Sequence, residues 1–303
     1  MNPLVAIDWG TTALRGARLG TDGAVLEERR FDRGVASVAP NAFEAVFDEH
    51  FGDWMAADNA LCLIGGMAGS KQGWVEAPYI PCPARFDDVC SQLTWVGAPR
   101  RIAIVPGLSC SHGGIPDVMR GEELQVFGAL QLLERHDGLL VLPGTHSKWV
   151  TVRAGHVKSF STVMTGEFYG LLRRHSFLAR SMPEADGEFD VPAFDQGVSV
   201  ALGSRSLMQT AFGVRTLSLF DRVRAQALPS YLSGLVIGEE LRSMMNQGLQ
   251  GGGDVIVIGA DALTQRYDRA LSQQGIGVTT LGAQAGWRGV WAVAQTLQDA
   301  VAQ

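Results

Sequence analysis

Short apolar runs alternate along the chain with longer segments in which apolar residues recur at helical spacing. The first runs predict three strands, at Leu4–Ile7, Leu14–Leu19 and Ala24–Phe31. The last two are joined by Gly20-Thr-Asp-Gly23, a sequence typical of a tight turn. The chain therefore opens with a three-stranded meander, and the later alternation of strands and helices predicts an α/β protein.

Two further strands are predicted in the first half of the chain, at Leu61–Gly66 and Arg101–Gly107. Each is followed by a glycine-containing segment, GGMAGSKQGW and LSCSHGGIPDVMRG, which we expect to form a loop. The next segment, EELQVFGALQLLER, has apolar residues at helical spacing. Glu122 and Glu123 would lie in the first turn of this helix, where acidic side chains are favourable.

The second half of the chain is predicted to contain three helices and one strand. These are helices at 166–181, 229–245 and 286–297 and a strand at Asp254–Gly259. Asp261 follows the strand and could cap the helix that comes next. The glycine-rich segment 247–253 is expected to form a turn or a flexible loop.

The opening stretch VAIDWGTTALRGARL has the same pattern as a later stretch, LLVLPGTHSKWVTVR, at residues 139–153. Both consist of a buried strand, a Gly-Thr turn and an outgoing strand, and Gly144 lies 134 positions after Gly10. A repeated unit of this kind predicts two related domains that face each other. We place the boundary near His136–Gly138, which gives domains at 1–137 and 138–303.

The first turn combines Asp8, Gly10, Thr11 and Thr12. Glycine lets backbone N–H groups approach a phosphate closely, and threonine hydroxyls add donors. A carboxylate at the end of a buried strand suits hydrated Mg²⁺, which binds one or two carboxylates together with phosphates. Arg15, on the following strand, could contact phosphate, orient the Asp8 carboxylate or face solvent.

The second turn supplies Gly144, Thr145, Ser147 and Lys148 as a matching phosphate clamp. Either turn alone could be an ordinary hairpin loop. Their pairing at matched positions favours a nucleoside triphosphate site instead.

The chain has no Walker-type phosphate loop, and its first strand is not followed by G-x-G-x-x-G, so other common nucleotide folds are not supported. In the later segment IGADAL, the backbone of Gly259 and Ala260 could pack against adenosine or form a plain strand-to-helix connection.

Composition and charge narrow the range of partners. The 303 residues carry a net charge of −6, so nothing basic points to nucleic acid or to an anionic membrane surface. The longest apolar runs fall short of the ~18 residues that span a bilayer, and the chain starts without a signal-peptide pattern. The four cysteines include no C-x-x-C pair, which disfavours zinc and a disulfide framework. We expect a soluble cytoplasmic protein. A homodimer is possible, and the oligomeric state stays open.

The motifs AIDWGTT, LPGTHSKW and VIGADAL resemble the phosphate and adenosine motifs of the superfamily of actin, sugar kinases and heat-shock chaperones. More narrowly, the sequence resembles the 2-dehydro-3-deoxygalactonokinase family. The segments that carry this resemblance run in order through most of the chain: IDWGTTALR, GGMAGSKQGWVEAPYIPCPA, PDVMRGEELQ, LPGTHSKWV, MTGEFYGLL and SYLSGLVIGEEL.

The resemblance implies two facing ribonuclease H-like (actin-like ATPase) domains with a nucleotide cleft between them. It also implies ATP- and Mg²⁺-dependent phosphorylation of a 2-keto-3-deoxy sugar acid, 2-dehydro-3-deoxy-D-galactonate, at its terminal (6-) hydroxyl in D-galactonate catabolism. Superfamily members often have an aspartate before the second turn, where this chain has Pro143. We therefore place Mg²⁺ on Asp8 alone.

The same resemblance suggests roles for residues of the first domain. Sugar kinases of the superfamily place an aspartate after the last strand of this domain, and Asp117 occupies that region as the candidate base, with Glu122 and Glu123 as rivals. The substrate carboxylate would meet Lys71 and Arg120. The candidate readers of substrate hydroxyls are Ser70, Gln72 and Glu122.

Several interpretations stay open at this point. Trp9 and Trp74 could wall the pocket or pack in the core, and His146 could act as a base but is better explained as a turn residue. Segment 165–167 could touch the nucleotide or simply start a helix. The alternatives to the proposed kinase are a kinase of the same fold for another sugar acid or polyol, and an actin-like ATPase or sugar sensor that is not a kinase.

Overall fold

The computed structural model describes residues 4–56, 60–97, 100–203, 206–248 and 254–302, with side chains described as far as residue 298. Its contacts divide the chain into two units. Unit 1 comprises Met1–Leu140, Trp149–Ser161 and Leu281–Gln303, and unit 2 comprises Val141–Lys148 and Thr162–Thr280. The domain boundary after residue 137 stays a prediction. No helix in the described part of the chain is long and apolar enough to cross a membrane.

Unit 1 is built on a six-stranded sheet with the order β3-β2-β1-β4-β8-β7. The strands are β1 (Leu4–Trp9), β2 (Leu14–Leu19), β3 (Val25–Phe31), β4 (Leu61–Gly66), β7 (Thr94–Val96) and β8 (Arg101–Ile104). The predicted meander of β1, β2 and β3 is confirmed, since both of its pairings are antiparallel. Strand β4 runs parallel to β1 and places Gly65 opposite Asp8. The first turn and the glycine loop after β4 therefore leave the same edge of the sheet.

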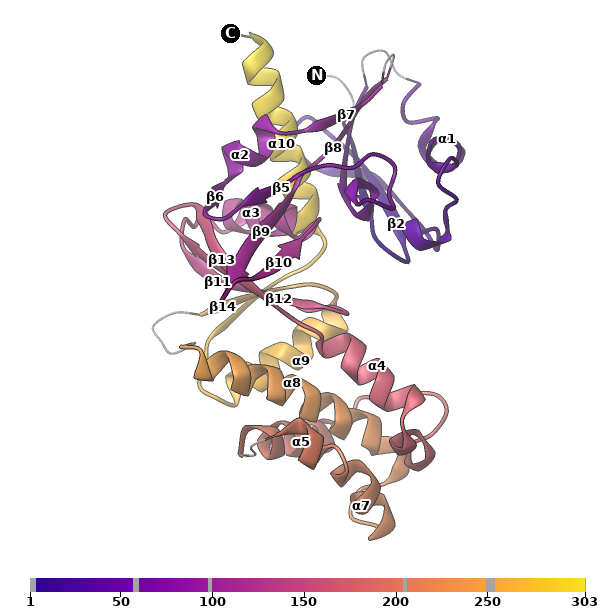
Figure 1. Cartoon of the computed structure of the whole chain (residues 1–303), viewed down its shortest axis with the longest axis vertical. Helices are drawn as coiled ribbons and strands as arrows, with labels where there is room; N and C mark the ends of the chain where they lie inside the picture. The colour runs from indigo at the N-terminus through magenta and orange to yellow at the C-terminus, as the bar shows by residue number, and fades with distance from the viewer. Residues whose placement is uncertain (1–3, 57–59, 98–99, 204–205, 249–253, 303) are drawn as a thin grey trace. The chain divides into compact units, whose positions relative to one another are not determined.

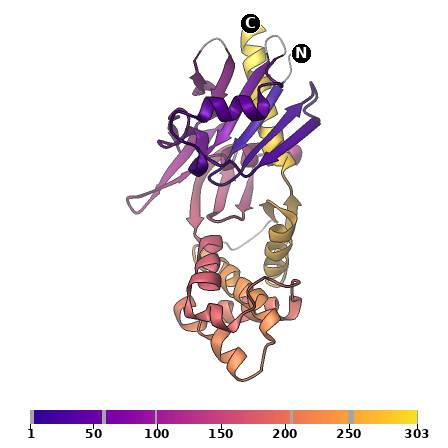
Figure 2. The same ribbon diagram turned by 90° about the vertical axis from the view of Figure 1, so that its right-hand side faces the viewer.

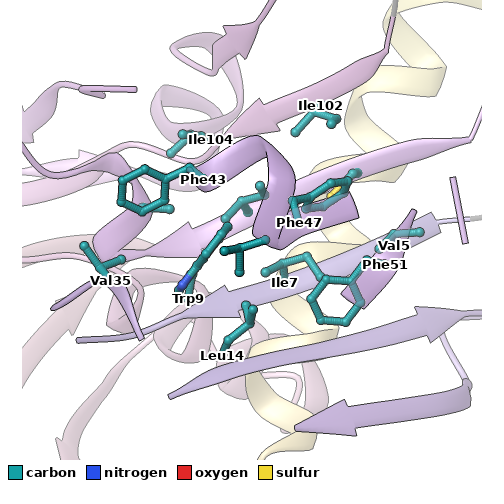
Figure 3. Packing of buried hydrophobic residues seen from close by; sticks show 14 of the residues in the cluster. Val5, Ile7, Trp9, Leu14, Val35, Phe43, Phe47, Phe51, Ile102 and Ile104 are labelled. Atoms are coloured by element: carbon teal, nitrogen blue, oxygen red, sulfur yellow. The ribbon is translucent and has the colours of Figure 1, made fainter. Parts of the chain in front are cut away.

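One face of this sheet packs against α1 (Phe43–Phe51) through an aromatic core (Figure 3). Trp9 is fully buried and lies edge-on to Phe43, with ring centroids 5.4 Å apart. Its indole Nε1 donates to the carbonyl oxygen of Arg33 at 2.9 Å. Trp74 lies edge-on to Trp9 with a centroid distance of 6.2 Å and is partly buried against the same cluster. Both tryptophans therefore pack in the core.

Helices α3 (Glu122–Leu132) and α10 (Gln284–Ala302) also belong to unit 1, and Figure 1 shows α10 running beside α3. Figure 2 shows α10, in yellow, behind the strands of this unit. Glycines allow this close approach. A Cβ atom on Gly128 would lie 1.9 Å from the carbonyl oxygen of Ala285, and one on Gly289 would lie 2.0 Å from that of Leu124. The predicted helices at 122–135 and 286–297 are confirmed.

A smaller sheet with the order β10-β9-β5 corrects the predicted loop after residue 107. Its strands are β5 (Tyr79–Pro81), β9 (Gly107–His112) and β10 (Ile115–Met119). The loop prediction over 108–121 was wrong because Gly113 and Gly114, with φ of 58° and 83°, form the turn of a hairpin. The predicted strand at 101–107 divides into β8 and β9 around Pro106, which has no N–H to donate.

The remaining strands belong to a sheet with the order β15-β14-β11-β12-β13-β6. They are β6 (Ala84–Arg85), β11 (Gly138–Leu142), β12 (Ser147–Arg153), β13 (His156–Val163), β14 (Val255–Ile258) and β15 (Val278–Leu281). The predicted second unit of strand, turn and strand is confirmed by β11, β12 and β13. The short helix α2 (Phe86–Ser91) follows β6.

Unit 2 is mainly helical, and Figure 1 shows α8 lying along α5. Its helices are α4 (Thr165–His175), α5 (Val191–Gly203), α6 (Leu207–Thr210), α7 (Gly213–Leu219), α8 (Leu228–Asn246) and α9 (Asp261–Ser272). The predicted helix over 166–181 stops at His175, and the Ser176 hydroxyl caps a separate 3₁₀ turn, Phe177–Ser181. The N-cap prediction for Asp261 was wrong, because the cap position is Ala260 and Asp261 is the first helical residue. Most of the loop predicted at 247–253 lies outside the described residues.

Candidate active site

Asp8 stands near the end of β1, directly opposite Arg15 on β2. The Arg15 guanidinium donates to the Asp8 carboxylate and forms an ion pair with it. Both side chains keep roughly a third or more of their surface exposed. Arg15 thus holds the Asp8 carboxylate at the end of the strand while leaving it open to a ligand.

The turn after β1 is anchored through its carbonyl groups. The carbonyl oxygens of Gly10, Thr11 and Thr12 accept hydrogen bonds of 2.9–3.1 Å from the N–H groups of residues 34–36. Gly34 allows this contact, because a Cβ atom there would lie 2.3 Å from the backbone of the turn. Thr11 and Thr12 are exposed, and their own N–H groups meet no acceptor within the described chain. A turn of this kind can receive an anion on its N–H side.

The second turn, in unit 2, packs directly on the start of α4. The N–H of Glu167 donates to the carbonyl oxygen of Thr145 at 3.0 Å, and the Glu167 carboxylate lies 2.6 Å from His146 Nε2. A Cβ atom on Gly166 would lie only 2.4 Å from the carbonyl oxygen of Gly144. These contacts explain why a glycine and a glutamate follow each other at 166 and 167. They also show that His146 helps to hold the conformation of the turn.

The two side chains after this turn point inward. Lys148 is buried, and its ammonium group donates to Thr162 Oγ1 at 2.7 Å. Ser147 is fully buried, and its hydroxyl lies 2.9 Å from the hydroxyl of Tyr267. Strand β12 therefore carries the Ser147 hydroxyl below the turn rather than toward a phosphate.

A pocket lies beside the second turn in unit 2. Its wall includes Gly144 and Gly166 near the turn, Ser233 and Ile237 of α8, and Leu263 and Arg266 of α9. The predicted adenosine residues Gly259 and Ala260 follow β14 and are not among the residues that line this pocket. A Cβ atom on Gly259 would lie 3.8 Å from the carbonyl oxygen of Pro143. The sequence did not suggest the contribution of α8, because helical periodicity does not reveal which polar residues meet a pocket.

In unit 1, Arg120 is almost completely buried at the end of the β9–β10 hairpin. Its Nη2 donates to the carbonyl oxygen of Ala77 at 2.8 Å, and its Nε lies 3.3 Å from the hydroxyl of Tyr79. The guanidinium also stacks over the Tyr79 ring, 4.1 Å from the centroid. These contacts fix the plane of the guanidinium group.

Arg120 Nη1 and the hydroxyl of Ser70 are both buried, and neither has a hydrogen-bond partner within the described chain. Ser70 follows β4 and the 3₁₀ turn Met67–Gly69, and it is 8% exposed. A Cβ atom on Gly69 would lie 2.7 Å from Arg120 Nη1, so this nitrogen lies against the backbone next to Ser70. Buried polar groups are normally paired, so these two atoms are candidates for contact with a ligand.

The other predicted substrate residues lie on the flanking segments. Lys71 and Gln72 are exposed in the loop after Ser70. The Glu122 carboxylate accepts a hydrogen bond of 2.9 Å from the N–H of Arg120. Asp117 is half-buried on β10 and accepts a hydrogen bond of 2.8 Å from the N–H of Val118.

Glu123 is fully buried, and both of its carboxylate oxygens accept the N–H of Gly121, at 2.9 and 2.7 Å. Burial, reinforced by the neighbouring charge of Glu122, raises the pKa of the Glu123 carboxyl to about 8. This side chain closes the start of α3 and lies out of reach of a substrate. Of the two rivals for the base, only Glu122 is accessible.

The raised pKa of Glu123 predicts a pH-dependent stability. Between its ordinary value of 4.5 and about 8, the folded protein keeps a proton that the unfolded chain releases. The free energy of unfolding therefore falls as the pH rises through this window, by up to about 1.4 kcal/mol per pH unit from this group. Urea unfolding from pH 5 to 8 should show a flatter dependence for Glu123→Gln than for the wild type. An equal slope would contradict this assignment.

The α/β fold recurs in a solved structure that has little sequence identity to this chain. An activator of 2-hydroxyisocaproyl-CoA dehydratase from Clostridium difficile, solved with ADPNP, shares the fold with a TM-score of 0.56 at 11% identity, over 99% of this chain and 98% of that one. The profile of the family 2-keto-3-deoxy-galactonokinase matches residues 8–293. The chain belongs to this family and is a kinase.

Two relatives define the relationship further. The 2-dehydro-3-deoxygalactonokinase of Escherichia coli K12 is 37% identical over 290 residues, which cover 94% of this chain and 96% of the relative. A crystal structure from Sinorhizobium meliloti, assigned to the 2-dehydro-3-deoxygalactonokinases, superposes with a TM-score of 0.90 at 36% identity. That comparison covers 97% of this chain and 99% of the other. The family and fold inferred from the sequence motifs are confirmed.

Proposed function

We propose that this kinase transfers the γ-phosphoryl group of ATP to the terminal (6-) hydroxyl of 2-dehydro-3-deoxy-D-galactonate, a step of D-galactonate catabolism. Family membership and the name of the Escherichia coli relative support this substrate. The structural observation that carries the proposal is a pair of buried atoms, Ser70 Oγ and Arg120 Nη1, which have no hydrogen-bond partner among the described residues.

A carboxylate is the ligand whose chemistry suits these two donor groups. The guanidinium is always charged, and its plane is already fixed by Ala77 and Tyr79, so it can donate to an anion without reorganising. The serine hydroxyl can donate to the second carboxylate oxygen or to the adjacent keto oxygen. Lys71 and Gln72 in the exposed loop, together with Glu122, are the proposed contacts for the rest of the sugar acid.

The nucleotide phosphates are proposed to bind the two turns. Thr11 and Thr12 offer N–H and hydroxyl donors, and Gly144 and Thr145 offer the second set. The N–H of Gly10 already donates to the carbonyl oxygen of Ala13 at 2.9 Å, so Gly10 would contribute only the close approach that its missing side chain allows. Arg15 and Lys148 would add positive charge, and the adenosine would lie in the unit 2 pocket near Gly259 and Ala260.

Mg²⁺ fits the first turn, because the Asp8 carboxylate is accessible and Mg²⁺ needs only one or two carboxylates besides phosphate oxygens. When bound, the ion would neutralise charge on the phosphates.

Asp117 is the proposed general base, which accepts the proton of the attacking hydroxyl. Phosphoryl transfer needs mainly positioning and charge stabilisation, so one correctly placed carboxylate suffices for the proton. The half-exposed position of Asp117 on β10 leaves its side chain accessible to a substrate.

The substitution Ser70→Ala tests the substrate site. With ATP and Mg²⁺ present, it should raise the KM for 2-dehydro-3-deoxygalactonate by about 5- to 30-fold, the equivalent of one lost hydrogen bond of ~1–2 kcal/mol. The KM for ATP should stay unchanged. Because the hydroxyl has no hydrogen-bond partner among the described residues, the free energy of unfolding should not fall.

Ser91→Ala is the matched control, since the Ser91 hydroxyl already donates to the carbonyl oxygen of Asp88 at 3.0 Å. It should change neither KM. An unchanged KM for the sugar acid in Ser70→Ala would contradict the proposed site.

A further inference from the structure

A buried network of hydrogen bonds lies beneath the second turn in unit 2. Glu240 of α8 is 2% exposed, and its Oε2 accepts the hydroxyl of Tyr267 at 2.6 Å. The same oxygen accepts the hydroxyl of Thr165. The Tyr267 hydroxyl also lies 2.9 Å from the hydroxyl of Ser147. One carboxylate oxygen therefore connects four elements, β12, α4, α8 and α9.

Both ends of this network adjoin the second turn. Ser147 is the first residue after the Gly144–His146 segment. Thr165 begins α4, and the next residue, Gly166, packs against Gly144. The Glu240 carboxylate thus connects Ser147, at the end of the turn, to α4, which packs against Gly144 at its start. The connection to Ser147 runs through Tyr267.

We propose that Glu240 is a positioning residue for the nucleotide phosphates, which acts by fixing the second turn against the start of α4. This inference rests on the part of the proposed function that assigns nucleotide binding to this turn. Thr165 and Tyr267 line the unit 2 pocket, whereas Glu240 does not. Glu240 therefore acts through these two residues.

The choice of a carboxylate has a physical reason. One oxygen must accept two hydroxyl donors in a site closed to water, and a carboxylate oxygen has the lone pairs to accept both. A satisfied polar network in such surroundings holds its members in one arrangement. Binding then does not have to order the turn, which increases affinity for the phosphates.

The first test is the affinity for ADP, measured by calorimetry without any sugar acid. Glu240→Ala should raise the Kd for ADP about 10- to 100-fold, while the KM for 2-dehydro-3-deoxygalactonate stays within twofold of the wild type. Tyr231→Phe removes a hydroxyl from another buried tyrosine of unit 2 and should leave the Kd for ADP unchanged. A folded Glu240→Ala protein with wild-type ADP affinity would overturn the inference.

A second test applies even where Glu240→Ala does not fold. Thr165→Val and Tyr267→Phe keep side-chain shape and remove one hydroxyl each. Each should raise the Kd for ADP about 3- to 10-fold, and the double variant should raise it by clearly less than the product, because both act through one oxygen. Strictly multiplicative effects would overturn the inference. A protein that binds ADP as expected but fails to phosphorylate the sugar acid would refute the proposed substrate alone.

Discussion

Replacing Asp117 with asparagine is expected to lower kcat for phosphorylation of the sugar acid by about 10²- to 10⁴-fold. The substitution removes the group that would accept the hydroxyl proton in the transition state. The KM for ATP and the Kd for ADP should change little, because Asp117 lies on the β10 strand of unit 1 and does not line the unit 2 pocket. Steady-state kinetics with ADP calorimetry measures both quantities.

The fold should survive this substitution, since the amide oxygen of asparagine can still accept the N–H of Val118. Glu122→Gln is the informative comparison, because Glu122 is the accessible rival for the base. It should keep kcat within about tenfold of the wild type and act mainly on the KM for the sugar acid. If Glu122→Gln loses turnover and Asp117→Asn keeps it, the base is Glu122.

The sequence predicted the central strands because buried strands leave a strong local pattern, which β1, β2 and β4 all carry. The helices α3 and α8 were predicted from their own sequence pattern, whereas α1, α5 and α7 were not predicted. The β9–β10 hairpin was missed because polar residues and Pro116 interrupt its apolar residues, and the Gly113-Gly114 signal was interpreted as a loop. The contact of α10 with α3 was not predicted either, since it depends on glycines far apart in sequence.

The candidate site was predicted only in part, for a different reason. Residue types and spacing indicated the two phosphate turns, and family resemblance pointed to Ser70 and Arg120. Neither could reveal that Ser70 Oγ and Arg120 Nη1 are buried without a hydrogen-bond partner in the part of the chain that the structure describes, because this depends on the tertiary fold. Glu240 was missed because the pair Glu239-Glu240 looks like two ordinary helix-surface glutamates in sequence. Only the packing of α8 against α4 and α9 places Glu240 inside.

The second large effect is expected from the substrate rather than the protein. An analogue of 2-dehydro-3-deoxygalactonate with a neutral amide in place of the carboxylate should show a kcat/KM roughly 10²- to 10³-fold lower. Binding it would leave the buried Arg120 charge without its anion, and a buried charge that loses its partner costs about 2–5 kcal/mol. Neutral hexoses and polyols, which lack both the acid and the keto group, should be poorer still.

The most direct test is one assay on the purified wild-type protein with ATP and Mg²⁺. ADP formation is followed for 2-dehydro-3-deoxygalactonate, its amide and a panel of neutral hexoses and polyols, and the product is examined by ³¹P NMR. A sugar-acid kinase with its carboxylate site at Ser70 and Arg120 should turn over 2-dehydro-3-deoxygalactonate rapidly, phosphorylate its terminal hydroxyl and discriminate against the amide. Rapid turnover of a neutral hexose, with none of 2-dehydro-3-deoxygalactonate, would contradict it.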